Sequence, residues 1–142
     1  MSHLENLKPL LTTHIDIRWG EMDAYGHINN AMYLRCMEEA RIRLLFQMGY
    51  KLDGRGQGPV IVNVSSTFLA PVEYPDQLSI DCYLSDAGRS SCMSHYKSYS
   101  EQKKHSCICD GSAKIVWIDT STGKSIELPQ AIREVIDRQS LD

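Results

Sequence analysis

The longest helical pattern in the chain lies between residues 31 and 48, where twelve of the 18 residues are apolar. At ~100° per residue, one stripe of an α-helix joins five of them: Tyr33, Met37, Ala40, Leu44 and Met48. Asn29 or Asn30 can cap the start of this helix, and Gly49 can adopt the left-handed conformation that ends it. The remaining apolar residues widen the buried sector, so we expect the helix to be covered over much of its circumference.

Alternating apolar and polar residues predict strands on both sides of this helix. Before it, residues 10–19 form one such strand, with an inward side made of Thr13, Ile15, Ile17 and Trp19. After it, strands are expected at residues 60–68, 78–84, 91–99 and 105–118. Gly111 is the expected site of a bulge in the last strand. A short final helix is expected from Pro129 to Arg138.

The order of these elements predicts the α+β class. A helix of 18 residues is ~27 Å long, and a strand of eight or nine residues spans about the same distance. One long helix followed by four successive strands therefore predicts an antiparallel sheet wrapped around one long central helix. The strands and helices do not alternate as a parallel sheet would require. The length of 142 residues predicts a single domain over residues 1–142.

Composition and charge exclude several classes of protein. The net charge of −3 argues against a nucleic-acid-binding surface, which is usually strongly basic. No apolar run approaches the ~18 residues needed to cross a bilayer, and residues 1–11 do not resemble a signal peptide. We therefore expect a cytoplasmic protein without a membrane partner. The five cysteines form no Cys-x-x-Cys pair, which favours free thiols over disulfides or a zinc site, and no metal is expected.

The most reactive set of residue types lies in residues 23–30, directly before the predicted helix. This segment holds a carboxylate, an imidazole, two amides and a glycine. The start of a buried helix presents backbone N–H groups without an intrahelical partner, and these can stabilise the oxyanion of an acyl carbonyl. A nearby carboxylate can activate water or attack the carbonyl. Asp and Asn before a helix are also common caps, so the residue types alone leave a structural role open.

The run from Trp19 to Tyr33, WGEMDAYGHINNAMY, is followed at residues 38–41 by Glu-Glu-Ala-Arg. Together these motifs resemble the hotdog-fold thioesterases of the 4-hydroxybenzoyl-CoA type, and especially their bacterial long-chain acyl-CoA thioesterase branch. The similarity in the order of elements extends over roughly residues 10 to 138. The resemblance implies a hotdog fold and an acyl-CoA thioesterase that releases a free carboxylic acid and CoA, with no metal or redox cofactor.

The same resemblance implies roles for individual residues. Asp23 takes the place of the catalytic acid, acting as general base or nucleophile, and the backbone N–H of Asn30 would polarise the thioester carbonyl. His27 matches the histidine of the related plant acyl-carrier-protein thioesterases and would orient Asp23 or water. Tyr25 stands where those enzymes have an asparagine.

Candidate substrate-binding residues follow from the resemblance as well. Tyr33 is a candidate for the acyl pocket. Ser66 and Thr67 lie where a partner subunit often completes that pocket in hotdog proteins. A basic side chain with two hydroxyls beside it suits the phosphates of CoA, and this cluster consists of Arg89, Ser90 and Ser91.

The family builds its site across a dimer, so we expect a homodimer or a dimer of dimers. Two alternatives to an acyl-CoA thioesterase stay open. One is a thioesterase for acyl carrier protein, against which the acidic net charge argues because the carrier is acidic too. The other is a non-catalytic acyl-CoA-binding module, which would bind CoA esters without releasing thiol.

Overall fold

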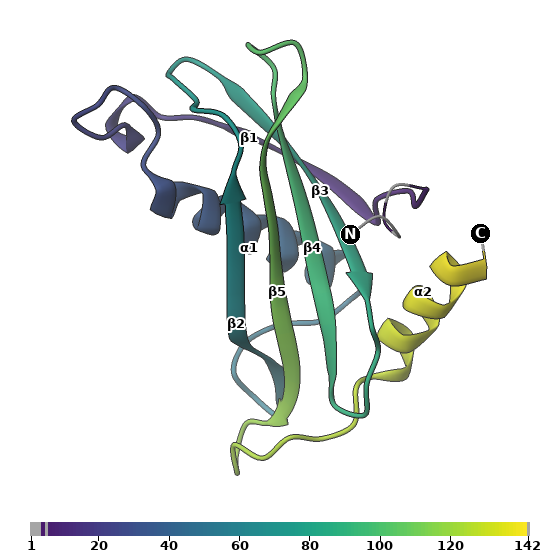
Figure 1. Ribbon diagram of the computed structural model, residues 1–142. Helices are drawn as coiled ribbons and strands as arrows, with labels where there is room; N and C mark the ends of the chain where they lie inside the picture. Colours follow the sequence, from purple (N-terminus) through teal and green to yellow (C-terminus); the bar gives the residue numbers. More distant parts are fainter. Residues whose placement is uncertain (1–3, 5, 142) are drawn as a thin grey trace.

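Five strands form one antiparallel sheet in the computed structural model of the protein, which describes residue 4 and residues 6–141 (Figure 1). The strands are β1 (Leu11–Asp16), β2 (Gln57–Phe68), β3 (Gln77–Ser85), β4 (Ser91–Ser100) and β5 (Ser106–Asp119). Their order across the sheet is β1-β3-β4-β5-β2, and all neighbours are antiparallel. The predicted α+β class with an antiparallel sheet is therefore confirmed.

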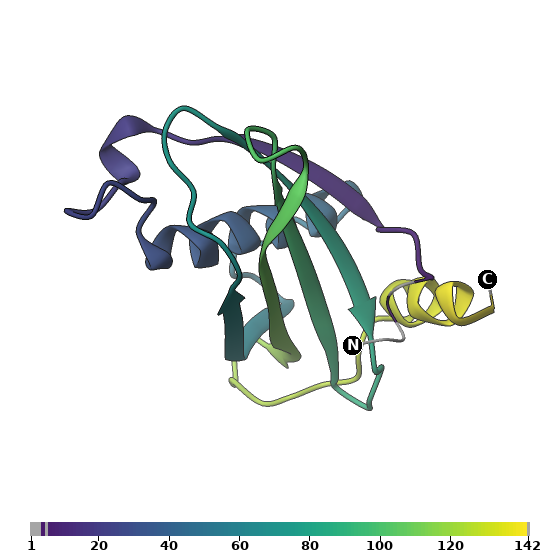
Figure 2. The same cartoon turned by 45° about the horizontal axis from the view of Figure 1, so that its top comes forward.

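Two α-helices pack on this sheet. The longer one, α1 (Asn30–Gln47), lies behind the strands in Figure 1, and α2 (Gln130–Leu141) lies beyond β3, as the rotated view in Figure 2 also shows. The predicted stripe of α1 is buried in the core through Tyr33, Met37, Ala40 and Leu44. No helix in the described part of the chain is long and apolar enough to cross a membrane.

Residues on either side of α1 determine where the helix begins and ends. Asn29 is the N-cap, and its Oδ1 accepts a hydrogen bond from the Ala31 N–H at 2.9 Å. Gly49 follows the C-terminus with a φ of 97°, a conformation that costs glycine little. Of the two asparagines expected at the cap, Asn29 therefore caps the helix, and Asn30 becomes its first residue.

One side of α1 and the neighbouring sheet edge stay open within the chain. Leu34 is 41% exposed and Phe46 is exposed as well, so the expected cover over most of the helix is not provided by this chain alone. Val62 on β2 is 57% exposed, and Val60 and Val64 are also exposed. The open side of α1 thus lies next to the apolar edge strand β2, whose outer side has no partner strand in the described part of the chain.

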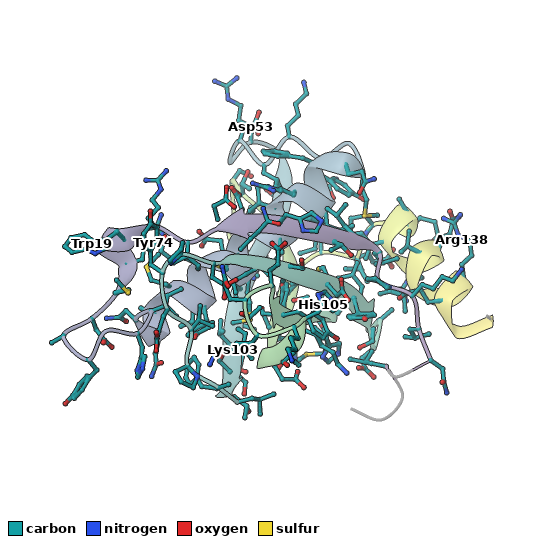
Figure 3. All side chains as sticks on the ribbon, turned by 90° about the horizontal axis from the view of Figure 1, so that it is seen from above. Trp19, Asp53, Tyr74, Lys103, His105 and Arg138 are labelled. Carbon is teal, nitrogen blue, oxygen red and sulfur yellow. The ribbon has the colours of Figure 1, made fainter. Side chains whose placement is uncertain are left out.

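The expected inward position of Trp19 is wrong. β1 ends at Asp16, and Trp19 instead begins a short 3₁₀-helix, η2 (Trp19–Glu21). The chain turns here because the Glu21 carboxylate accepts a hydrogen bond from the Arg18 N–H at 2.6 Å. Trp19 is consequently 72% exposed at the end of the molecule (Figure 3).

The bulge expected at Gly111 is also wrong. Gly111 pairs in regular register with Ser66 on β2 and Tyr96 on β4, and the register shifts lie elsewhere, between Ile61 and Asn63 and between Ser98 and Tyr99. A Cβ at Gly111 would instead collide with the Met37 sulfur. The glycine is needed because α1 approaches β5 closely at this point.

We expect Gly111→Ala to lower the free energy of unfolding by about 1–3 kcal/mol, the usual cost of overpacking a core. Gly58→Ala is the matched control, because Gly58 also lies in a strand but has no atom within 4 Å of an added Cβ. Urea unfolding measures both variants. An equal effect of the two substitutions would contradict the close approach of α1.

Burial raises the pKa of five core groups to about 12, because ionisation in the core loses hydration. They are the thiols of Cys36, Cys82 and Cys92, with an ordinary pKa of 9.0, and the phenols of Tyr33 and Tyr96, with an ordinary pKa of 10.0.

As the pH rises from about 9 towards 12, these groups ionise first in the unfolded chain, which stabilises the unfolded state. We therefore expect the free energy of unfolding to be fully retained below pH 9 and to fall steadily above it. Urea unfolding at pH 8, 9.5 and 11 tests this expectation. A constant free energy of unfolding up to pH 11 would contradict the assigned burial.

Candidate active site

A cavity of about 310 Å³ opens at the N-terminus of α1. Its walls come from the loop before α1, the first turn of α1 and the segment that follows β2: Asp23, Tyr25, His27, Ile28, Asn30, Tyr33, Phe68, Leu69, Ala70 and Pro71. A hydrogen bond from the Ile28 N–H to the Val72 carbonyl, 2.7 Å long, holds the loop against the segment after β2. Four residues singled out in the sequence, Asp23, His27, Asn30 and Tyr33, thus line one cavity.

The carboxylate of Asp23 is held by a tight turn. Its Oδ1 accepts a hydrogen bond from the Tyr25 N–H at 2.9 Å, and the backbone of Asp23 bonds to both His27 and Gly26. Gly26 has a φ of 81°, which explains the glycine in this turn. Among the described residues Oδ2 of Asp23 has no hydrogen-bond partner, so one carboxylate oxygen is fixed and the other is available.

The first turn of α1 leaves one backbone donor without a partner among the described residues, and it belongs to Asn30, which lines the cavity. Asn29 accepts hydrogen bonds from two N–H groups of this turn. Its side chain accepts from the Ala31 N–H, and its backbone carbonyl accepts from the Met32 N–H. The N–H of Asn30 has no partner within the described part of the chain. It is the type of donor that stabilises a developing oxyanion.

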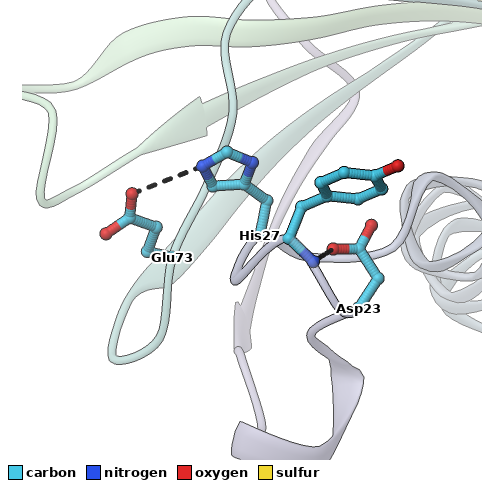
Figure 4. Close-up of polar contacts among 4 residues, drawn as sticks. Asp23, His27 and Glu73 are labelled. Atoms are coloured by element: carbon cyan, nitrogen blue, oxygen red, sulfur yellow. Dashed lines mark hydrogen bonds and ion pairs between the residues drawn. The ribbon is translucent and has the colours of Figure 1, made fainter.

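His27 is paired with a residue that the sequence did not indicate. Its Nε2 lies 3.6 Å from Oε1 of Glu73, and the two side chains are 42% and 67% exposed (Figure 4). No hydrogen bond joins the His27 ring to Asp23 among the described side chains. Glu73 belongs to the connection between β2 and β3, and nothing in the local pattern around either residue could have predicted their contact.

Aromatic rings form the apolar wall of the cavity. The rings of Tyr33 and Phe68 pack with their centroids 5.3 Å apart and an interplanar angle of 54°. Burial raises the pKa of Tyr33 to about 12, and the nearby Cys109 and Cys36 add to the rise. The phenol is therefore neutral at physiological pH and can border an acyl group without adding charge.

The other predicted substrate-binding residues lie outside this cavity. Ser66 faces β5, with its Oγ 3.2 Å from the Cys109 sulfur, and Thr67 is exposed at the β2 edge. The cavity residue Phe68 is level with Ser98 on β4, because both pair with Cys109.

The cluster of Arg89, Ser90 and Ser91 lies at the end of β4 opposite to Ser98. The length of the extended strand between the two ends places the cluster ~20 Å from the cavity. The carbonyls of Arg89 and Ser90 accept hydrogen bonds from Leu128 and Trp117. Within one chain the structure therefore does not bring this cluster to the cavity.

The cavity combines a partly free carboxylate, a free backbone donor and an apolar wall. This set suits attack on an acyl carbonyl, because the donor can hold the oxyanion while the carboxylate drives the nucleophile. The described residues bring no three His, Cys, Asp or Glu side chains together as a metal site. The cavity therefore has the groups that acyl-transfer chemistry requires.

The chain belongs to the Thioesterase-like superfamily, whose profile matches residues 17–136. The protein is accordingly a thioester hydrolase, and the resemblance to hotdog-fold thioesterases seen in the sequence is confirmed.

Individual relatives match nearly the whole chain. The long-chain acyl-CoA thioesterase FadM of Escherichia coli (strain K12) is 28% identical over 90% of this chain and 98% of its own. The PA2801 protein of Pseudomonas aeruginosa, assigned as a candidate thioesterase, is 33% identical with a TM-score of 0.85, over 89% of this chain and 98% of its own. A thioesterase from Thermus thermophilus, complexed with coenzyme A and Zn, is 27% identical with a TM-score of 0.79, over 94% of this chain and 96% of its own.

We expect Glu73→Gln to shift the tautomer of His27 while changing the free energy of unfolding by less than about 1 kcal/mol, as is usual for an exposed ion pair. The carboxylate favours a proton on Nε2, which leaves Nδ1 as an acceptor. Imidazole ¹⁵N chemical shifts report this balance. The matched control is Glu127→Gln, on an exposed glutamate outside the cavity, and equal His27 spectra in both variants would contradict the pairing.

Proposed function

We propose that the protein hydrolyses acyl-CoA thioesters at the cavity of Asp23 and Asn30. One observation carries the proposal: a carboxylate oxygen without a partner and a backbone N–H without a partner, among the described residues, line the same cavity at the start of α1. The long-chain acyl-CoA substrate named for the FadM relative and the coenzyme A bound to the Thermus thioesterase support CoA as the thiol.

In the proposed reaction, the thioester carbonyl oxygen accepts a hydrogen bond from the Asn30 N–H. In one route Asp23 takes a proton from water as the water oxygen bonds to the carbonyl carbon, and the C–S bond then breaks. In the other route the Asp23 carboxylate attacks that carbon, the C–S bond breaks to leave an acyl–Asp23 anhydride, and water then hydrolyses the anhydride. In both routes the electron pair of the C–S bond and a proton that comes from water go to sulfur. The products are a carboxylic acid and CoA thiol, and His27, held by Glu73, orients the water.

Tyr33 is proposed to border the acyl group from α1. Ser66 and Thr67 on β2 lie outside the cavity of their own chain and are candidates for completing the acyl pocket of a second copy. The cluster of Arg89, Ser90 and Ser91 is the candidate for the CoA phosphates. Because this cluster lies a strand length from the cavity of its own chain, we propose that it serves the cavity of a second copy.

We also propose that two copies associate through β2. This strand is twelve residues long and has no neighbour on its outer side among the described residues, and such an edge readily pairs with another strand. Its exposed valines and Leu34 of α1 offer apolar surface beside the edge. The sheets of the two copies would then join into one that wraps around both α1 helices.

The two alternatives from the sequence differ in what they release. A carrier-protein thioesterase releases thiol from acyl carrier protein, and a binding module releases none. A thiol-release assay with acyl-CoA esters of increasing chain length, aromatic esters and an acyl carrier protein ester separates them, with calorimetry to detect binding. Release from CoA esters supports the proposal, and binding without release overturns it.

We expect Asp23→Asn to lower the turnover number by at least ~100-fold, the scale of a lost acid–base group, without loss of the fold. The amide can still accept the hydrogen bond from the Tyr25 N–H, so the turn is kept. Thiol release and thermal unfolding measure the two properties.

Asp53→Asn is the matched control for this experiment. Asp53 makes the same kind of turn, with its Oδ1 3.0 Å from the Arg55 nitrogen, in a separate loop (Figure 3). Normal turnover in the control and a large loss in Asp23→Asn support the assignment. A folded Asp23→Asn protein with near-normal turnover would remove Asp23 from the catalytic machinery.

A further inference from the structure

Arg41 on α1 is a buried cation without an anion among the described residues. Its side chain belongs to a residue that is only 9% exposed, and its Nη1 donates to the hydroxyl of Tyr96 at 3.1 Å. No carboxylate in the described part of the chain lies within ion-pair distance of it. Buried arginines are normally paired, because an isolated charge in the core loses its hydration without compensation.

The hydroxyl that Arg41 contacts is a fixed acceptor. Tyr96 donates its own hydrogen to Ser94 at 2.5 Å, and Ser94 donates in turn to the Ala113 carbonyl at 3.1 Å. This chain of hydrogen bonds aims the Tyr96 oxygen at Arg41. A guanidinium carries five N–H donors, so one neutral acceptor leaves most of its capacity unused.

The guanidinium borders an open cavity of about 360 Å³, which we call the Arg41 hollow. It lies between α1 and the strands β2, β4 and β5, with walls made of Leu34, Arg35, Met37, Glu38, Arg41, Ile61, Val64, Tyr96 and Ala113. Most of these walls are apolar. An anion entering the hollow would therefore meet Arg41 in a weakly screened environment.

Glu38 is the acid that borders the same hollow. It is exposed, and it has no partner among the described side chains, whereas its neighbour Glu39 pairs with Arg43 at 3.6 Å. Glu38 and Arg41 do not pair with each other, because Arg41 turns inward to Tyr96. The hollow is thus lined by one acid, Glu38, and by two bases, Arg35 and Arg41, none of which has an ion-pair partner among the described residues. Of the two bases, Arg41 is buried and Arg35 is exposed.

The positions of Glu38 and Arg41 suit a symmetric contact. They lie three residues apart on α1, ~60° apart around the helix axis, on the side that faces the open β2 edge. In a two-fold dimer, when residue i of one copy meets residue j of the other, the reverse contact forms as well. Two copies of α1 that cross antiparallel over the hollow therefore place each acid opposite the other copy's base.

We propose that Arg41 of each copy pairs with Glu38 of the partner subunit, so that two reciprocal ion pairs close the two hollows. The inference rests on the dimer proposed above and specifies how its helices meet. The apolar β2 edge supplies area for association, and the ion pairs select one register of the two helices, since other registers leave Arg41 buried and unpaired.

Charge reversal tests the pairing. Glu38→Arg places only cations at the two positions, and Arg41→Glu places only carboxylates there. We expect each variant alone to raise the dimer dissociation constant at least ~30-fold, as for the loss of a buried charge pair. An equimolar mixture of the two variants should form heterodimers of near wild-type affinity, because both crossed pairs are then complementary. Sedimentation equilibrium and native mass spectrometry measure this.

Glu39→Arg is the matched control, since Glu39 is the adjacent acid and pairs within its own helix; it should leave the dissociation constant nearly unchanged. If Arg41→Glu does not fold by circular dichroism, Glu38→Gln and Arg41→Gln replace the reversals. The double variant should then weaken the dimer no more than either single variant does.

Four outcomes overturn the pairing. The first two come from the charge reversals: the mixture of folded variants stays dissociated, or dimer affinity is restored only when both reversals are in one chain. The other two are additive effects of the two glutamine substitutions and equal effects of Glu38→Arg and Glu39→Arg. Neither reversal changing the dimer dissociation constant would also overturn the pairing. If Arg41→Gln then slows the hydrolysis of CoA esters that carry a terminal carboxylate, the hollow holds a substrate anion instead. A monomeric wild-type protein overturns the dimer as well, whereas thiol release tests the hydrolase separately.

Discussion

The hydrogen bond between Ile28 and Val72 is the contact on which the candidate site depends. It holds the loop before α1 against the segment after β2, so that residues from distant parts of the chain form one cavity. The cap by Asn29 then fixes where α1 begins and leaves the Asn30 N–H without a partner in the described part of the chain. Without this arrangement the carboxylate of Asp23 would lie in an ordinary loop turn, as the carboxylate of Asp53 does.

One side of α1 is more deeply buried than the other, and the less buried side is where we infer contact with a second copy. One side is packed so closely that a Cβ at residue 111 of β5 would collide with the Met37 sulfur. The other side leaves Leu34 exposed and Arg41 buried, with no anion beside it among the described residues. A single chain therefore satisfies its core but not this charged position, which is why a second copy is the partner we infer.

Much of the fold could be predicted because local periodicity reports burial directly. The stripe of α1, the succession of strands along the chain and the antiparallel sheet followed from patterns of period 3.6 and 2, whereas the order of the strands across the sheet came from the structure. Two predictions failed for different reasons. Trp19 is exposed because a local hydrogen bond from the Arg18 N–H to the Glu21 carboxylate turns the chain, a contact that the alternating pattern does not report. Gly111 accommodates Met37 of α1 rather than a bulge, and this contact is non-local.

The sequence by itself determined the residue types of the site and their place before α1, since Asp23, His27 and Asn30 lie within eight consecutive residues whose motif resembles the thioesterase family. Only the tertiary structure decided their partners. Glu73 reaches His27 from the connection between β2 and β3, and Arg41 turns towards Tyr96 rather than Glu38. Such contacts depend on how strands far apart in the chain are brought together, and local patterns contain no information about that distance.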